Sequence, residues 1–271
     1  MCRLLAYSGE PIFLEALVCK PQHSLVRQSM RADEAKVTTN GDGFGLGWYT
    51  GHADRAEPGV YREVTPAWSD ENLLALCSVV RSPLFFAHVR ATTGTAVARH
   101  NCHPFRHGKY LFMHNGQIGD YSKVRRPLEA TLPDHLYATR KGATDSELMF
   151  LLIMAHIESG TAPVQAVTDM LSHVVDLMRE QCIKTPLRFA ATLSDGKLLH
   201  AFRFSTDDKP PTMYLSRCGN LGGIVVASEP LQDRASPECP EWNALAPDTS
   251  ITIDGTKVTP QAIVIREAAL A

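Results

Sequence analysis

The sequence begins Met1-Cys2-Arg3-Leu4-Leu5-Ala6-Tyr7, and this stretch, residues 1–7, is the one around which the rest of the chain is organised. Cysteine is a small second residue of the kind that permits removal of Met1, which would leave Cys2 with a thiol and a free α-amine. The apolar residues 4–7 are typical of a β-strand, so we expect this end of the chain to be fixed within a sheet. Cysteines near a chain end are more often small buried hydrophobic residues than nucleophiles. The stretch therefore raises a catalytic hypothesis that other motifs must support.

The composition is that of an ordinary soluble globular enzyme. The chain has 271 residues, of which 44% are hydrophobic and 21% charged, and its formal net charge is -2. No basic stripe is present, so neither nucleic acid nor an anionic membrane is favoured as a partner. No apolar run approaches the roughly 18 residues that a membrane span needs, and no secretory signal is visible. We therefore expect a cytoplasmic protein.

The seven cysteines form no known motif; they are Cys2, Cys19, Cys77, Cys102, Cys182, Cys218 and Cys239. Their odd number, their scatter and the lack of a Cys-x-x-Cys pair argue against a disulfide framework and for a reducing compartment. Around Cys102 stand His100, His103, His107 and His114, but their spacing matches no structural zinc pattern. We therefore expect neither a metal site nor a cofactor.

A glycine-rich stretch, Asn-Gly-Asp-Gly-Phe-Gly-Leu-Gly-Trp-Tyr, occupies residues 40–49. Its glycines predict a tight turn that leads into a strand passing very close to other backbone. A phosphate-binding loop is not favoured, because no Gly-Lys-Ser/Thr follows and the stretch continues into a strand pattern rather than a helix.

The remaining pattern predicts strands, then two central helices, then strands again. Before the helices we expect helical structure within 10–31, strands at 60–64, 84–90 and 110–116, and a helix at 70–80 capped by Ser69. The central helices start at Thr144, where Glu147 completes a capping box, and at Pro163. Later strands are expected at 188–194, 197–204, 213–216, 224–228, 250–253 and 262–266, the first two joined by an Asp195-Gly196 turn. This order indicates an α+β layered domain.

Six motifs stand in order along the chain. They are Met1-Cys2 before a strand, Gly41-Asp42-Gly43-Phe44-Gly45, His88-Val89-Arg90-Ala91-Thr92-Thr93-Gly94, Asn101-Cys102-His103-Pro104-Phe105, His114-Asn115-Gly116 and Thr144-Asp145-Ser146-Glu147. Taken alone, Asn115-Gly116 would predict a plain hairpin turn. Taken together, the six closely resemble class II glutamine amidotransferases, which use an N-terminal nucleophile. The resemblance covers at least residues 2–157, and Ala227-Ser228-Glu229-Pro230-Leu231 extends it to most of the chain.

This resemblance implies a fold and the catalytic residues. The implied fold is a four-layer αββα sandwich of two antiparallel sheets, the N-terminal nucleophile hydrolase fold, formed by a single domain over residues 1–271. Cys2 would attack the substrate amide once Met1 is removed. Asn115 and the backbone amide of Gly116 would form the oxyanion hole.

The same resemblance implies the residues that bind substrate. Arg90 would bind the α-carboxylate, Asp145 would bind the α-ammonium, and Thr93 and His103 would line or support the pocket. Each type also has a plain structural alternative: Arg90 alone could form a structural ion pair, and Asp145 alone could be an acidic residue in the first turn of a helix. His103 and His114 could equally be core histidines with satisfied hydrogen bonds.

The chemistry of amide cleavage supports these residue types independently. A free thiol has a pKa near ~8.5, so it needs a base whose own pKa lies near neutrality. An α-amine, with a pKa of roughly 7.7–8.0, is partly neutral at pH 7 and is already positioned when it belongs to the nucleophile. A side-chain amide and a backbone N–H can each stabilise the oxyanion by roughly 3–4 kcal/mol.

The chain ends at Ala271, soon after the region of resemblance, so it looks like the stand-alone, YafJ-like type. That type is similar to the γ-glutamyl amidohydrolases of ergothioneine synthesis and glutathione degradation, and His23-Ser24-Leu25 with Gln28-Ser29 fits it. The leading expectation is hydrolysis of the glutamine side-chain amide through a γ-glutamyl thioester, with ammonia released or delivered to a separate subunit. The alternatives are hydrolysis of a larger γ-glutamyl amide and a non-catalytic glutamine-binding or regulatory subunit. The leaving group, the partner subunit and the oligomeric state stay open.

Overall fold

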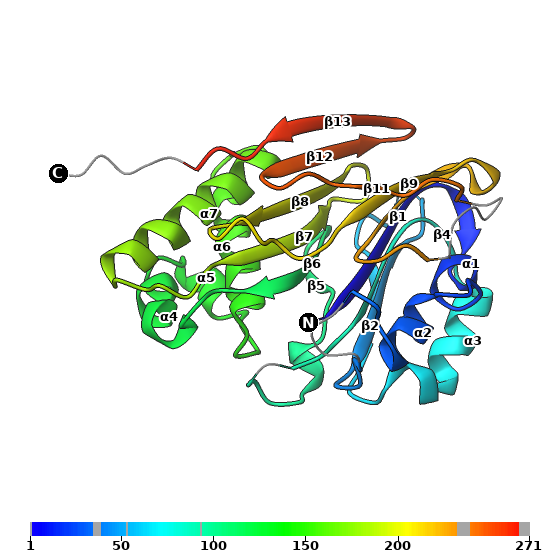
Figure 1. Cartoon of the computed structure of the whole chain (residues 1–271), viewed down its shortest axis with the longest axis horizontal. Coiled ribbons are helices and arrows are strands. Elements are labelled where there is room, and N and C mark those ends of the chain that lie inside the picture. Colours follow the sequence, from blue (N-terminus) through cyan, green and yellow to red (C-terminus); the bar gives the residue numbers. More distant parts are fainter. Residues whose placement is uncertain (1, 35–38, 53, 93, 232–238, 266–271) are drawn as a thin grey trace.

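The computed structural model describes residues 2–34, 39–52, 54–92, 94–231 and 239–265. Within these ranges, two antiparallel β-sheets pack face to face, and helices cover the outer face of each sheet (Figure 1). The four layers confirm the predicted αββα sandwich and its α+β class.

The first sheet holds the N-terminal strand near its centre. Among the described residues it has seven strands, in the order β11 (Asn243–Ala244), β9 (Tyr214–Cys218), β10 (Gly223–Ala227), β1 (Arg3–Phe13), β4 (Arg81–Val89), β2 (Phe44–Tyr49) and β3 (Gly59–Glu63). β1 pairs with β4 on one side and β10 on the other, so that Leu4 lies opposite His88 and Leu5 opposite Ala227. The prediction of a strand directly after Cys2 is confirmed.

The second sheet carries the rest of the strands. In the described ranges it has six, in the order β13 (Lys257–Ala262), β12 (Thr249–Asp254), β8 (Leu199–Ser205), β7 (Arg188–Ser194), β6 (Tyr110–Gln117) and β5 (Phe105–His107). The predicted Asp195-Gly196 turn joins β7 to β8. There the Asp195 carboxylate accepts hydrogen bonds from the backbone N–H groups of Lys197 and Leu198, and Gly196 has a φ of 90°.

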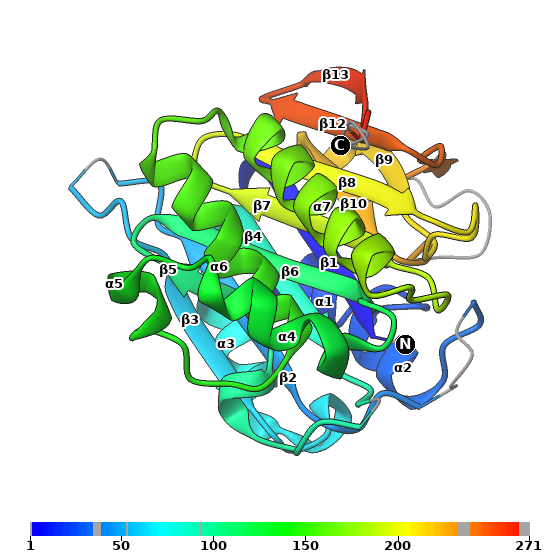
Figure 2. The same ribbon diagram turned by 90° about the vertical axis from the view of Figure 1, so that its left-hand side faces the viewer.

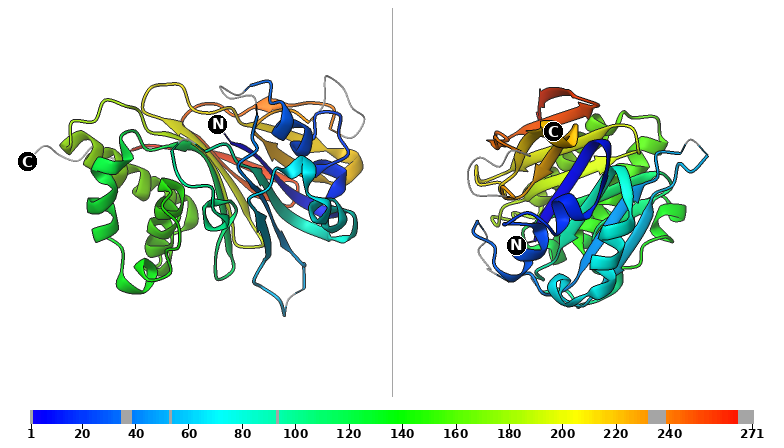
Figure 3. Two further views of the ribbon diagram at one scale, coloured as in Figure 1. Left: turned by 90° about the horizontal axis from the view of Figure 1, so that it is seen from below. Right: turned by 90° about the vertical axis from the view of Figure 1, so that its right-hand side faces the viewer.

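The helices divide between the two outer faces. α4 (Tyr121–Ala130), α5 (Asp134–Tyr137), α6 (Asp145–Glu158) and α7 (Pro163–Glu180) cover the second sheet (Figure 2), whereas α1 (Glu15–Val18), α2 (Leu25–Met30) and α3 (Glu71–Val79) cover the first (Figure 3). Short 3-10 helices lie at η1 (Ala67–Ser69), η2 (Arg99–Asn101) and η3 (Gly219–Leu221). Apolar cores form between the sheets and under each helical layer. Of the helices described, none is long and apolar enough to cross a membrane.

The helical structure predicted within residues 10–31 is only partly present. β1 continues to Phe13, because after an irregularity Ile12 and Phe13 pair with Ser82 and Arg81 of β4. Helix is limited to the short α1 and α2, on either side of Pro21. Pairing of β1 with β4 thus gives the first of these residues a strand conformation where a helical turn was predicted.

Several further details differ from the sequence prediction. Asp70, not Ser69, caps α3, since its carboxylate accepts a hydrogen bond of 2.7 Å from the backbone N–H of Leu73. Asn115-Gly116 is not a turn, because β6 continues through both residues in pairing with β7. The final strand, predicted at 262–266, lies earlier as β13, and α4, α5 and β5 were not predicted.

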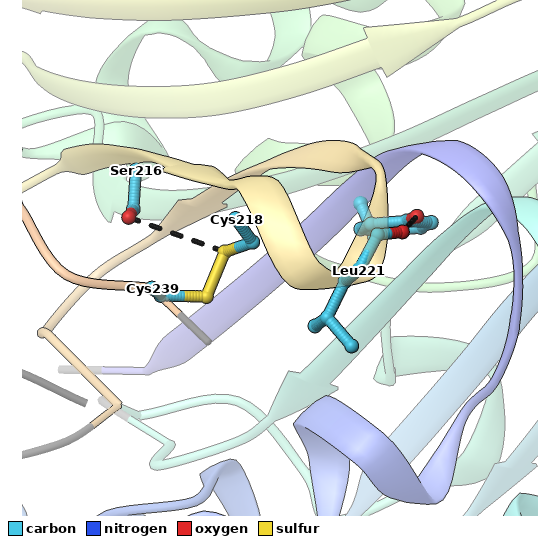
Figure 4. The surroundings of a disulfide bond; sticks show 5 residues. Ser216, Cys218, Leu221 and Cys239 are labelled. Atoms are coloured by element: carbon cyan, nitrogen blue, oxygen red, sulfur yellow. Dashed lines mark hydrogen bonds between the residues drawn. A yellow bond between two sulfur atoms is a disulfide. The ribbon is translucent and has the colours of Figure 1, made fainter. Parts of the chain in front are cut away.

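Cys218 and Cys239 form a disulfide, which corrects the expectation that the cysteines form no disulfide framework (Figure 4). Their Cα atoms are 4.2 Å apart although the residues lie 21 positions apart in the sequence. No short motif marks such a pair, because the fold alone brings the end of β9 beside Cys239. The other five cysteines have free thiols.

Candidate functional site

A cavity of about 240 Å³ lies beside the start of β1, the ends of β4 and β6, and the start of α6. We call it the Cys2 cavity. Every predicted site residue that the structure describes lines it, namely Cys2, Arg90, His103, Asn115, Gly116 and Asp145. Thr93 lies outside the described residues. Side chains from both sheets and from the first turn of α6 therefore meet at one place.

Cys2 directly precedes β1, and the strand holds it at the cavity wall. Its thiol lies 3.6 Å from the carbonyl oxygen of Ala91, to which it donates a weak hydrogen bond. Burial raises the pKa of the Cys2 thiol, while the guanidinium groups of Arg90 and Arg3 act in the opposite direction. The resting side chain is therefore a thiol that needs a base before it can attack.

Asn115 offers an amide that the protein itself does not use. Its side chain is 1% exposed, and neither polar atom has a hydrogen-bond partner among the described residues. Buried amides are normally paired, so an unpaired one facing a cavity is available to a ligand. Next to it, Gly116 has a φ of 152°, and a Cβ there would collide with the carbonyl oxygen of Arg188. Only glycine fits this position.

Arg90 carries a buried charge without a counter-ion. Its side chain donates to neutral acceptors: Nη1 to the Asp42 carbonyl at 3.3 Å, and Nη2 to the Thr95 hydroxyl at 2.7 Å, with further bonds to Thr92 and the Ala96 carbonyl. None of the ion pairs among the described residues includes it. The structure therefore gives no support to a structural ion pair, and the uncompensated charge favours an anionic ligand.

Asp145 is an acidic residue in the first turn of α6, as its structural alternative predicted, and it also lines the cavity. One carboxylate oxygen accepts a hydrogen bond of 2.8 Å from the backbone N–H of Ile118, and the other accepts one of 2.9 Å from Ser146. The Ser146 hydroxyl also donates to Oδ1 at 3.4 Å, so Oδ2 is the carboxylate oxygen that retains a further lone pair for a ligand. The residue is thus held in the first turn of α6 with acceptor capacity left over.

The two histidines differ in their contacts. His114 hydrogen-bonds through Nδ1 to the Ser146 hydroxyl at 2.8 Å and through Nε2 to the Arg188 carbonyl at 3.3 Å. His103 has no hydrogen-bond partner among the described residues, and its ring lies 4.3 Å from that of His88. Burial lowers the pKa of both His103 and His114, so both rings are neutral at pH 7.

The glycine-rich stretch supports the Arg90 loop. The Gly43 carbonyl accepts from the backbone N–H of Arg90 at 2.8 Å, and the Asp42 carboxylate accepts from that of Thr92, also at 2.8 Å. At Gly45, a Cβ would collide with the carbonyl oxygen of His103. The predicted close approach to other backbone is therefore confirmed, and its partners are the two segments that line the Cys2 cavity.

Asn101 and Arg188 are among the cavity residues that were given no role from the sequence. Asn101 binds the Ala96 carbonyl at 2.9 Å and accepts from the Ala143 N–H at 3.2 Å, which ties the Arg90 loop to the segment before α6. Asn101 is the first residue of one of the six motifs, so the sequence did point to this position. Arg188 begins β7, and no local pattern distinguished it from other strand ends. Among the described residues no group of His, Cys, Asp and Glu is placed to hold a metal ion.

Comparison with known proteins shows the family of the chain. The model of the family described as glutamine amidotransferases class-II matches residues 1–217. Probable glutamine amidotransferase DUG3 of Saccharomyces cerevisiae is 31% identical over 93% of this chain and 82% of its own length. Gamma-glutamyl-hercynylcysteine sulfoxide hydrolase of Mycolicibacterium smegmatis is 32% identical over 44% of this chain and 52% of its own.

Solved structures give the same result. A glutamine aminotransferase class-II domain protein from Silicibacter pomeroyi superposes with a TM-score of 0.74 and 34% identity, covering 97% of this chain and 99% of that one. Glutamine phosphoribosylpyrophosphate amidotransferase from B. subtilis shares the fold, with a TM-score of 0.66 and 14% identity over 98% of this chain and 50% of its own. On the family match and these relatives, the chain belongs to the class II glutamine amidotransferases.

Proposed function

We propose that the protein hydrolyses γ-glutamyl amides, with Cys2 as the nucleophile and a γ-glutamyl thioester as the intermediate. The side chains that line the Cys2 cavity are the observation that supports this proposal. One cavity contains a thiol, together with a side-chain amide and a guanidinium that have, among the described residues, no hydrogen-bond partner and no counter-ion, respectively. These groups match the attack, the oxyanion and the substrate carboxylate of the reaction.

The first half-reaction forms the thioester. Once Met1 is removed, the α-amine of Cys2 takes the proton of its own thiol, and Sγ bonds to the γ-carbonyl carbon. The resulting oxyanion accepts hydrogen bonds from the Asn115 side chain and the backbone N–H of Gly116, each worth roughly 3–4 kcal/mol. When the C–N bond breaks, the α-ammonium returns the proton to the leaving nitrogen, which departs as ammonia or a larger amine.

Water completes the cycle. The α-amine takes a proton from water as the water oxygen attacks the thioester carbonyl. When the C–S bond then breaks, the α-ammonium returns this proton to Sγ, which releases glutamate and regenerates the Cys2 thiol and the free α-amine. One amide and one water are consumed, so the reaction balances without a cofactor. Because the base is on the nucleophile, no histidine is needed, which agrees with the lowered pKa of His103 and His114.

The amino-acid head of the substrate would lie between a cation and an anion. Arg90 would bind the α-carboxylate in place of its missing counter-ion, and Asp145 would accept from the α-ammonium. Thr93 and His103 would line the same part of the pocket. Each interaction replaces water with a fixed, oppositely charged or polar group, which orients the γ-amide toward Cys2.

Glutamine is the smallest substrate that this chemistry accepts, and a γ-glutamyl peptide is a larger one. The cavity, at about 240 Å³, is below the ~300–1,000 Å³ of typical small-molecule sites, which favours compact substrates. The relative from M. smegmatis is named a hydrolase of a γ-glutamyl compound, which supports the larger class. Release of ammonia to a partner subunit, a single catalytic domain over the whole chain and action in the cytoplasm are part of the same proposal.

Intact mass tests the nucleophile. The purified protein should lack one methionine and, after treatment with a diazoketone analogue of glutamine, should gain one adduct that is absent in Cys2→Ser. Cys182 is an exposed free thiol, so Cys182→Ser is a matched control that should keep the adduct. A chain that retains Met1, or that gains no adduct, would argue against the mechanism.

Substrate assays separate the remaining alternatives. Glutamate release should be measured with glutamine and with glutathione. Hydrolysis of either supports the proposal and ranks the two substrate classes. If neither releases glutamate while glutamine still binds, the alternative of a non-catalytic glutamine-binding subunit is correct.

A further inference from the structure

A second arginine lines the Cys2 cavity, and neither glutamine nor the mechanism above requires it. Arg188 is the first residue of β7, and its side chain is 19% exposed. It lies opposite Gln117 in the pairing of β6 with β7, while Asn115 lies opposite Ala190. Residues two apart on a strand share a face of the sheet, so Arg188 and Asn115 project from the same face. The side chain of Arg188 therefore projects on the same side of the sheet as the proposed oxyanion donor Asn115.

Arg188 is held in one orientation by an acidic partner. Its Nη2 donates to the Asp207 carboxylate at 2.5 Å, and its Nε donates to both carboxylate oxygens at 3.2 and 3.3 Å. Asp207 is fixed in turn by the Ser205 hydroxyl at 2.9 Å. A guanidinium fixed along one edge loses little side-chain entropy when its remaining donors bind a ligand.

The other edge of the guanidinium is unused. Nη1 of Arg188 makes no hydrogen bond with the described residues, and Asp207 is not part of the cavity wall. A guanidinium has five N–H donors, so the Asp207 pair leaves capacity for a second carboxylate. The neutralising charge thus comes from outside the cavity wall, and Nη1 is the donor that remains for a ligand.

A count of charges shows what this arginine adds. The glutamyl head is a zwitterion, and Arg90 and Asp145 already provide one cation and one anion for it. Ammonia, the leaving group of glutamine, has nothing that a guanidinium would bind. An amino acid or short peptide as leaving group ends in a carboxylate, which a planar guanidinium recognises well.

We propose that Arg188 is a specificity-determining residue that binds a carboxylate on the leaving group, so that the preferred substrates are γ-glutamyl amides of amino acids or short peptides. The inference rests on the proposed hydrolysis of γ-glutamyl amides. It assigns Arg188 to the leaving-group side of the scissile bond and Arg90 to the glutamyl side. Asp207 is a positioning residue that acts through Arg188.

Two substrates of nearly equal size test this assignment. γ-Glutamylglycine and γ-glutamylglycinamide differ only in a terminal carboxylate against a neutral amide. The wild-type protein should prefer the acid by about 10- to 100-fold in kcat/KM, mainly through KM, the range for a hydrogen bond to a charged group. In Arg188→Met this ratio should fall to about one. General damage to the site affects both substrates alike and cancels in the ratio.

Three further variants control the result. In Arg188→Met the Asp207 carboxylate loses its partner and could repel the acid substrate. The double variant Arg188→Met/Asp207→Asn removes this negative charge, and its acid-to-amide ratio should also be about one. Arg188→Lys keeps the charge without the fork and should give an intermediate ratio. Arg179, an exposed arginine of α7, is a matched control, and Arg179→Met should keep the wild-type ratio.

The outcomes separate the inference from the function on which it rests. Equal ratios in the wild type and Arg188→Met, with both substrates hydrolysed, would overturn the role of Arg188 and leave the hydrolase intact. If Arg188→Met loses activity toward glutamine, acid and amide substrates equally, the acid-to-amide ratio keeps its wild-type value, and the assignment of Arg188 to the leaving group is wrong. A wild-type protein that hydrolyses none of the three would refute the proposed function and this inference with it.

Discussion

Two buried arginines near the nucleophile are held in opposite ways. Arg3, directly after Cys2, is 0% exposed and donates at 2.9 Å to the Glu229 carboxylate, which is itself 1% exposed. Arg90 is 3% exposed and contacts neutral acceptors alone among the described residues. Within the part of the chain that the structure describes, the charge of Arg3 has a counter-ion and the charge of Arg90 has none.

The difference separates the scaffold from the site. Glu229 also binds the His23 ring at 2.8 Å and the backbone N–H groups of Asp33 and Glu34, so its carboxylate lies in a closed network that fixes the start of β1. Nε and Nη2 of Arg3 have no hydrogen-bond partner among the described residues. In the Cys2 cavity, by contrast, Arg90 has no counter-ion among the described residues, and the Asn115 amide has no hydrogen-bond partner among them. Because both residues line the cavity, their unused charge and hydrogen-bonding capacity are available to a substrate.

The largest expected effect comes from the nucleophile itself. Cys2→Ala should reduce glutamate release by about 10⁴-fold or more, because no other group can form the thioester. Its melting temperature should stay close to that of the wild type, since the Arg3 network is untouched. Steady-state hydrolysis and a thermal melt measure the two quantities. Retention of more than about one tenth of the activity would be incompatible with a Cys2 nucleophile.

Breaking the closed network should act on stability instead. Glu229→Gln leaves Arg3 buried without a counter-ion and should lower the free energy of unfolding by about 3–5 kcal/mol. Denaturant titration measures this change. Glu241 is exposed, and Glu241→Gln should change stability by less than about 0.5 kcal/mol. Equal stability of the two variants would remove the distinction between the two arginines.

Removing the unpaired amide of Asn115 should instead reduce activity and leave stability almost unchanged. Asn115→Ala should lower kcat by about 10²- to 10³-fold through loss of an oxyanion donor. Stability should change little, because the amide has no partner among the described residues to lose. Parallel measurement of kcat and unfolding free energy distinguishes the two effects. Loss of stability with unchanged kcat would place Asn115 in the scaffold.

The smallest expected effect is a pH dependence of the closed network. Burial would raise the pKa of Glu229, but hydrogen bonds from His23 and from the backbone of Asp33 and Glu34, with the charge of Arg3, outweigh burial and hold it below its usual range. Glutamate in an unfolded chain has a pKa of about 4.3, so this stabilisation is complete above that value and is lost as pH falls through the lower folded pKa.

The wild type should therefore lose stability between neutral pH and pH ~3, and Glu229→Gln should lose less over the same interval. Unfolding free energies at several pH values test this. Parallel pH profiles for the two proteins would show that other carboxylates dominate acid unfolding.

Much of the fold and the site could be predicted because their signals are local and ordered. The strand after Cys2, the Thr144 cap of α6 and the hairpin at Asp195-Gly196 each depend on a few adjacent residues. The site residues stand in short motifs whose order resembles a known family, and the described ones line one cavity.

The features that could not be predicted depend on contacts distant in sequence. β1 extends to Phe13 because of its pairing with β4, and Asn115-Gly116 stays extended because β7 lies beside it. The Cys218–Cys239 disulfide has no motif. Arg188 resembles any charged residue at a strand end until the fold places it in the Cys2 cavity.

The position of β1 has a practical consequence for anyone who produces this protein. The strand begins at Arg3, so no spacer separates the proposed nucleophile from the sheet. An affinity tag or fusion partner placed before Cys2 would convert the proposed catalytic amine into a peptide bond, and the product would fold normally but be inert. Recombinant material should therefore carry its handle elsewhere, or be cleaved by a protease that leaves cysteine as the first residue.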